Sequence, residues 1–170
     1  MKITSVPVLG LSACLLLCPA VSALAENTHR VGGGVNYWVM LDDVDVKDFD
    51  DKGLSYLGSY QYRLGLFGIE GDLEVMPNRG EHTAVAPQAY VLVGDTLYAG
   101  AGVGIIYSGG EFADDPFFGL KAGLNLELLP DFYTDISLNY RFSKKEDLKN
   151  KNTRIDTDTV FLGAAVRFGL

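Results

Sequence analysis

Three carboxylates occupy alternate positions in the segment LFGIEGDLEVM, residues 66–76, and a cluster of this kind could take part in acid–base chemistry. Glu70, Asp72 and Glu74 share one parity, while the residues between them are apolar or glycine. Because a β-strand sends successive side chains to opposite faces, this segment has one apolar face and one face that carries three carboxylates. The role of the carboxylates therefore depends on what lies opposite them.

The histidines offer little support for an enzyme. The chain has two, His29 and His82. A catalytic histidine needs a nucleophile within hydrogen-bond reach and a third group that orients it. Neither histidine is followed by an H-x-S pair, no G-x-S-x-G segment occurs, and no glycine motif precedes a helix to cradle a phosphate. We therefore expect no catalytic residue, no cofactor and no metal site.

An acidic segment, DDVDVKDFDDKG at residues 42–53, could bind calcium or share divalent cations with lipopolysaccharide. Lys47 stands where a calcium loop needs its third ligand, so the pattern favours a solvated acidic loop. A basic segment near the C-terminus could contact lipopolysaccharide phosphates or an external partner, although solvation alone also explains it. The loop candidates are Asp42, Asp43, Asp45, Asp48, Asp50, Asp51, Lys144, Lys145, Lys149 and Lys151.

Eight segments alternate apolar residues with polar or very small ones, and they predict eight strands. Each segment is long enough for a tilted strand to cross a bilayer, which takes about 9–11 residues. Strands in soluble sheets are usually shorter, at about five or six residues. The predicted strands are residues 29–41, 54–64, 66–76, 82–94, 96–107, 116–128, 131–142 and 156–169.

The connections between these strands alternate in length. Short turns are predicted at Gly65, at Gly94-Asp95 and at Pro130-Asp131, whereas the other connections are longer and polar. The shortest of the longer group is PNRGE, residues 77–81. Short turns on one side and longer loops on the other are typical of outer-membrane barrels, with the turns in the periplasm.

A soluble, lipocalin-like barrel would also alternate, with its apolar face turned inward, so the pattern of glycines and aromatics decides between the two. Glycines such as Gly100, Gly102 and Gly104 crowd the polar parity, which suits a narrow filled lumen. Aromatics of the apolar parity gather toward strand ends, as in the girdles at lipid headgroup level. The fourth strand, with Pro87 and Gln88, is ambiguous in register.

The C-terminal segment FLGAAVRFGL resembles the closing strand of Gram-negative outer-membrane barrels, matching it at Gly163, Val166 and Phe168. It departs at Leu170, where that family usually ends in an aromatic residue. The opening VGGGVNYW is also common among small eight-stranded barrels of the OmpA/OmpX-like family. The whole chain after its leader resembles this family, which implies an eight-stranded antiparallel up-and-down transmembrane β-barrel in the outer membrane.

In such a barrel the interior is just filled by side chains, so charged groups on the polar parity should pair with one another. We expect Arg63 near Glu70, and Asp135 near Arg167. A narrow, gated ion path is the alternative interpretation. The predicted interior charge network is Arg63, Glu70, Asp72, Glu74, Lys121, Glu127, Asp135, Arg141 and Arg167.

Residues 1–25 read as a cleaved signal peptide: Lys2, an apolar run, and a small-residue site at residues 23–25. Both cysteines lie within it, so residues 26–170 form one domain without disulfides. Without Lys2, 13 basic residues face 22 acidic ones, which makes nucleic acid a poor partner.

We therefore expect a monomeric, non-enzymatic outer-membrane barrel with a structural or surface-interaction role. Its partners would be membrane lipid, lipopolysaccharide and an external ligand of its loops. A narrow small-solute or ion channel and a lipid A-modifying barrel enzyme are the alternatives.

Overall fold

The computed structural model describes eight long antiparallel strands and several of their connections. The described residues are 28–41, 52–79, 82–113, 115–143, 146–147, 154–155 and 158–170. The long strands are β1 (Thr28–Met40), β2 (Lys52–Leu64), β3 (Phe67–Arg79), β4 (His82–Gly94), β5 (Leu97–Gly104), β8 (Phe117–Leu129), β9 (Phe132–Ser143) and β12 (Thr159–Gly169). Among these residues, no helix is long and apolar enough to cross a membrane.

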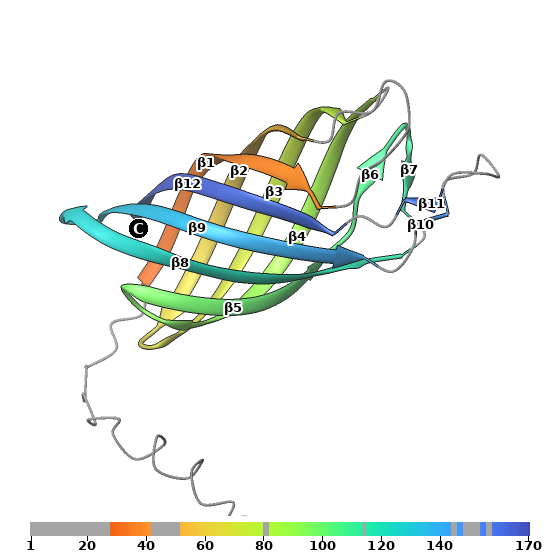
Figure 1. The fold of residues 1–170 in the computed structure, drawn as a ribbon. Coiled ribbons are helices and arrows are strands. Elements are labelled where there is room, and N and C mark those ends of the chain that lie inside the picture. Colours follow the sequence, from red (N-terminus) through yellow and green to blue (C-terminus); the bar gives the residue numbers. More distant parts are fainter. Residues whose placement is uncertain are drawn as a thin grey trace, which may run out of the picture.

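The long strands close into a barrel (Figure 1). They follow the order β3-β2-β1-β12-β9-β8-β5-β4, and a further pairing of β3 with β4 completes the ring. First and last strands are therefore neighbours, with Val35 opposite Ala164. Closure leaves each of the eight long strands with a neighbour on both sides, which is a requirement for strands surrounded by lipid. The predicted eight-stranded antiparallel barrel is confirmed.

The three predicted short turns lie at one end, which we call the turn end. Gly65, Gly94 and Asp131 have φ angles of 58°, 108° and 61°, so these turns use the left-handed region that glycine and aspartate tolerate. The backbone N–H of Leu170 donates to the carbonyl of His29 at 2.9 Å, which places the C-terminus at this end too. The opposite end is the loop end.

The second connection is shorter than predicted. β3 continues through Pro77 to Arg79, and Arg79 pairs with His82, so only residues 80–81 separate β3 from β4. The prediction of a loop at residues 77–81 was wrong. The ladder shifts register between Met76 and Arg79, and such an irregularity tolerates a proline, which has no N–H to donate.

The predicted strand at 96–107 is interrupted after Gly104. Ile105 donates to the carbonyl of Pro87 at 3.1 Å, but Pro87 has no N–H to return a hydrogen bond. Pairing resumes at β6 (Tyr107–Ser108), which forms a small hairpin with β7 (Glu111–Phe112). A second small pair, β10 (Glu146–Asp147) with β11 (Arg154–Ile155), also lies at the loop end (Figure 1).

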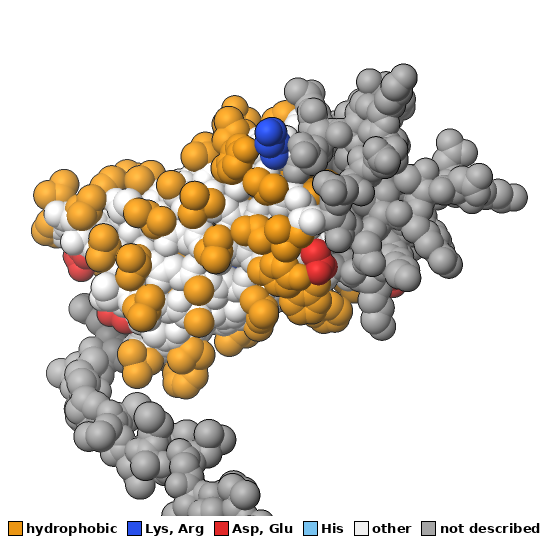
Figure 2. Space-filling view, in the orientation of Figure 1, with side chains coloured by type: hydrophobic (Ala, Val, Ile, Leu, Met, Phe, Trp, Pro, Cys, Tyr) orange, Lys and Arg blue, Asp and Glu red, His pale blue; other side chains and the backbone are white. Residues whose placement is uncertain are grey.

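The wall is apolar outside and polar inside. Leu120, Ile136 and Leu162 are each more than half exposed, whereas Glu70 and Arg167 are fully buried. Figure 2 shows hydrophobic side chains spread over the barrel wall, with the few visible charges near its ends. This is the inverse of a soluble lipocalin-like barrel. It also resolves the fourth strand, whose even-numbered residues from Ala84 to Leu92 face inward.

Interior glycines make room for large side chains. A Cβ at Gly102 would lie 2.4 Å from the ring of Tyr90 and 2.3 Å from the carbonyl oxygen of Ala89. At outward-facing Gly71, a Cβ would meet no atom within 4 Å.

We therefore expect Gly102→Val to lower the free energy of unfolding by about 1–3 kcal/mol or to prevent folding, because it overpacks the lumen. Gly71→Val, the matched control, should leave stability near wild type. The urea midpoint and the heat-modifiable gel mobility measure both effects. Equal behaviour of the two variants would show that the glycines do not serve as spacers.

Candidate functional site in the barrel interior

Two carboxylates of β3 share the ammonium group of Lys121 from β8. Lys121 Nζ donates to Glu70 Oε1 and, at 3.1 Å, to Asp72 Oδ2. Glu70 also accepts from Gln61 at 2.6 Å and from Arg167 Nη2 at 3.1 Å. Glu70 thus has two cations and an amide around one buried carboxylate, which offsets the cost of removing its charge from water.

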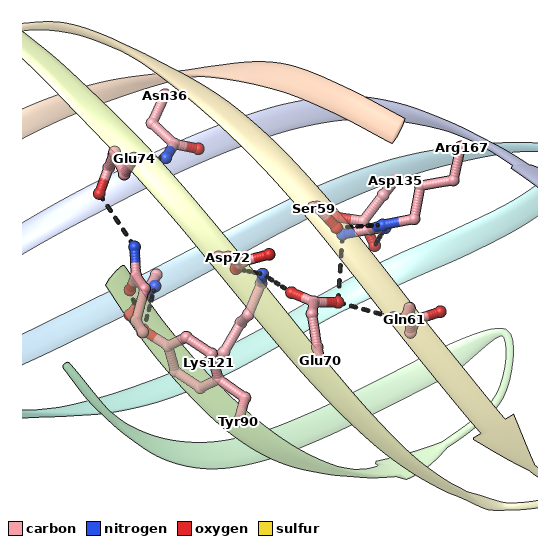
Figure 3. A network of polar contacts seen from close by, with 12 residues as sticks. Asn36, Ser59, Gln61, Glu70, Asp72, Glu74, Tyr90, Lys121, Asp135 and Arg167 are labelled. Carbon is pink, nitrogen blue, oxygen red and sulfur yellow. Dashed lines mark hydrogen bonds and ion pairs between the residues drawn. The ribbon is translucent and has the colours of Figure 1, made fainter. Parts of the chain in front are cut away.

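Arg167 of β12 extends this group across the lumen. Its Nη1 lies 3.2 Å from Asp135 Oδ2 on β9, and its Nε donates to Ser59 Oγ at 2.9 Å. The members come from five strands, so the contacts cross the barrel rather than follow one sheet pair (Figure 3). We call this the Glu70 cluster: Gln61, Ser59, Glu70, Asp72, Lys121, Asp135 and Arg167.

A second cluster surrounds Glu74, which lies on the same face of β3 as Glu70 and Asp72 and nearer the loop end. Arg141 Nη2 and Ser55 Oγ both donate to its carboxylate. Asn36 donates to it at 2.7 Å and Gln88 at 3.2 Å. Glu74, completely buried, therefore accepts four hydrogen bonds, as many as a carboxylate can arrange around its two oxygens. These five residues are the Glu74 cluster.

Tyr90 of β4 connects the two clusters. Its hydroxyl donates to Gln88 at 2.8 Å and accepts from Asn139 at 2.9 Å. Lys121 Nζ lies 5.3 Å from the centre of the Tyr90 ring, within the range of a cation–π interaction. The middle of the lumen is thus one continuous polar network (Figure 3).

An apolar layer covers the network at the loop end. Arg141 marks the boundary: its guanidinium lies 3.8 Å from the ring centre of Phe161 and 4.9 Å from that of Phe117. The layer consists of Trp38, Met40, Met76, Ala84, Ala86, Phe117 and Phe161.

The structure brings most of the predicted network together, but two details differ. The predicted proximity of Asp135 and Arg167 is confirmed by their ion pair. Arg63, expected near Glu70, forms its ion pair with Asp95, and Gln61 rather than Arg63 lies opposite Glu70 in the β2–β3 ladder.

Glu127 does not belong to the network. It lies near the turn end, is exposed, and accepts a hydrogen bond from the backbone N–H of Asp131 at 3.3 Å. The strand register shifts just beyond it, between Glu127 and Leu129, so continued alternation was a poor guide there. The aspartates of residues 42–51 and the four loop lysines lie outside the described residues, as does the predicted signal peptide.

Several interior residues were not predicted, most of them because only charged residues were considered. Strand parity would have found them, since each shares the inward parity of its strand. They include an arginine, neutral hydrogen-bonding residues and the aromatic residues of the apolar layer: Arg30, Asn36, Trp38, Ser55, Ser59, Gln61, Gln88, Tyr90, Phe117, Asn139 and Phe161.

Among the described residues, no histidine belongs to this network. His29 lies on the barrel exterior, where its Nδ1 hydrogen-bonds the Tyr60 hydroxyl at 2.6 Å, far from the interior carboxylates. Within the described residues, no group of three or more histidine, cysteine, aspartate or glutamate side chains could hold a metal ion. The geometry pairs charges and hydrogen bonds across the lumen.

Wall and interior together define a closed eight-stranded antiparallel β-barrel of the transmembrane type. The solved structure of Neisserial surface protein A (NspA) is similar, with a TM-score of 0.61 and 19% identity over 84% of this chain and 96% of that one. Another match is the Yersinia pestis outer membrane protein Ail, at a TM-score of 0.46 and 17% identity over 84% of this chain and 100% of that one. No protein-family model and no curated protein sequence matches the chain. The NspA match confirms, at the level of the fold, the resemblance to small eight-stranded outer-membrane barrels.

Replacing Arg167 tests whether the network stabilises the barrel. Arg167→Ala removes a fully buried cation and takes from Glu70 and Asp135 the positive charge that Arg167 supplies. This loss should lower the free energy of unfolding by roughly 3–5 kcal/mol. Urea unfolding in micelles and heat-modifiable gel mobility measure the loss. Glu127→Gln, on an exposed side chain, is the control and should change little. Unchanged melting of Arg167→Ala would leave the network idea without support.

Proposed function

We propose that the protein is a non-enzymatic outer-membrane barrel that holds its loop end toward the cell exterior and acts there as a structural or surface-interaction protein. The observation that carries the proposal is the distribution of side chains: an apolar wall around a lumen whose charges pair with one another. Such a wall suits hydrocarbon, and the filled lumen leaves the loops as the variable surface.

The two unlike ends support this orientation. Short turns and the C-terminus share the turn end, the arrangement typical of the periplasmic side of bacterial outer-membrane barrels. Export would use residues 1–25 as a cleaved signal peptide, and the location would be the outer membrane of a Gram-negative cell. The acidic residues 42–51 and the lysines of residues 144–151 would then meet lipopolysaccharide or an external partner.

A narrow channel for ions or small solutes is the second candidate, because the middle of the lumen is polar. The apolar layer opposes it: Trp38 and Phe161 are each only 1% exposed and lie between the charged network and the loop end. Conductance measurements in planar bilayers separate the two functions, since a plugged barrel gives no unitary steps.

Protease treatment of intact cells tests location and orientation together. Endoproteinase Lys-C added outside should cut at the lysines of residues 144–151 and spare Lys121, which is 4% exposed and faces the lumen. Mass spectrometry of the membrane fraction identifies the fragments. A variant with Lys144, Lys145, Lys149 and Lys151 changed to Gln should lose those cuts. Recovery of the protein in the soluble periplasmic fraction, or cleavage only after the outer membrane is opened, would contradict the proposal.

A further inference from the structure

Two arginines lie inside the turn end of the lumen with most of their hydrogen-bonding capacity unused. Arg30 of β1 is 6% exposed and Arg63 of β2 is 2% exposed. In each, Nε and Nη1 are buried and donate no hydrogen bond to any described residue. Unpartnered charged donors at such depth are costly, so their presence calls for an explanation.

The contacts that these arginines do make leave their charge largely uncompensated. Arg30 packs its guanidinium 3.6 Å from the centre of the Tyr133 ring. Arg63 Nη2 donates to the carbonyl oxygen of Asp95 at 3.1 Å, and the Asp95 carboxylate is 3.9 Å away on a 63% exposed side chain. Among the described residues, no carboxylate forms an ion pair with Arg30.

The two arginines are close neighbours on the same inner surface. Arg30 lies opposite Gln61 in the β1–β2 ladder, and Arg63 is two residues further along β2 on the same face. Diagonal neighbours of this kind are about 7–8 Å apart at the backbone, within reach of long side chains. Their like charges therefore repel each other where water is scarce.

Arg141 also leaves Nε and Nη1 without a hydrogen-bond partner, but it and the other buried cations each have a buried carboxylate beside them. Lys121, Arg141 and Arg167 each form an ion pair with a carboxylate whose side chain is no more than 2% exposed. The turn end thus holds two positive charges and lacks the buried negative charge that the middle of the lumen supplies.

We propose that the turn end of the lumen binds an oxyanion of the phosphate class between Arg30 and Arg63. Guanidinium groups present paired N–H donors that match the oxygens of a phosphate, and charge-assisted hydrogen bonds of this kind are strong. The bound anion satisfies the unpartnered nitrogens and removes the repulsion. Free phosphate and the phosphate of a lipid headgroup share this chemistry. The site lies at the opposite end from the loops, so it is independent of the surface-interaction role.

The test uses the full mature protein in alkyl-glycoside micelles, which contain no phosphate. Inorganic phosphate is titrated at constant pH and ionic strength against chloride, and the thermal midpoint is followed. Binding to the folded state should raise the midpoint with phosphate concentration. A second arm replaces phosphate by short-chain phosphatidic acid mixed into the micelles, which distinguishes a lipid source from a free anion.

Arg30→Gln and Arg63→Gln should each weaken phosphate binding roughly tenfold, as expected for a lost hydrogen bond to a charged group. Lys52→Gln, which removes one exposed positive charge at the other end of β2, is the matched control and should keep the full response. Because the response to phosphate is compared within each variant, a change in basal stability does not obscure it.

A phosphate response, or a phosphatidic acid response, that Arg30→Gln weakens about tenfold supports the proposal, and the arm in which it occurs identifies the source of the anion. No response in either arm, or an equal response in Lys52→Gln and Arg30→Gln, overturns it. Glu26 is the first residue after the predicted signal peptide. A phosphate response that appears only after Glu26→Gln would show that a carboxylate of the chain itself occupies the arginines, and it would also overturn the proposal.

Discussion

The cost of placing charge in a narrow closed barrel is the constraint on which this structure depends. Carboxylates at 70, 72 and 74 share one face of β3, and a face toward lipid would leave them without water or partners. They therefore point inward, where burial demands a cation for each. Lys121, Arg141 and Arg167 meet that demand from β8, β9 and β12.

This pairing organises the packing around it. Long side chains that cross the lumen need space on the strands they meet, which the interior glycines provide; a Cβ at Gly119 would lie 2.7 Å from the hydroxyl oxygen of Tyr90. The interior is layered as a result. An apolar layer with Trp38 closes the loop end, paired charges fill the middle, and Arg30 and Arg63 occupy the turn end. A soluble protein has one apolar core, whereas here the apolar residues mostly form the outer wall.

Much of the fold could be predicted from the sequence because strand parity is a local property. Alternation in β3, β8 and β12 separated inside from outside, and Gly65, Gly94 and Asp131 marked the turns. Parity does not say how far a long side chain reaches, so it could not identify Asp95 as the ion-pair partner of Arg63.

Prolines and strand ends also limited how much of the structure could be predicted from the sequence. Pro87 of β4 has no N–H to donate, so the pairing with β5 stops where Pro87 lies opposite Ile105. The two residues are about 18 positions apart in the sequence, and only the strand register shows that they face each other. Alternation also does not show where a strand leaves the closed part of the barrel. Glu127, near the end of β8, was therefore predicted to face the lumen although it is exposed. Trp38 and Phe161 were overlooked because attention to charged residues passes over aromatics of the same parity.

A double-mutant cycle on Glu74 and Arg141 tests most directly whether paired charges replace a core. Glu74→Leu and Arg141→Met are made singly and together, and unfolding free energies are measured in micelles. If the charges exist to neutralise each other, each single variant is strongly destabilised, by roughly 3–5 kcal/mol, and the double variant recovers most of that loss. Losses that simply add in the double variant would contradict the account.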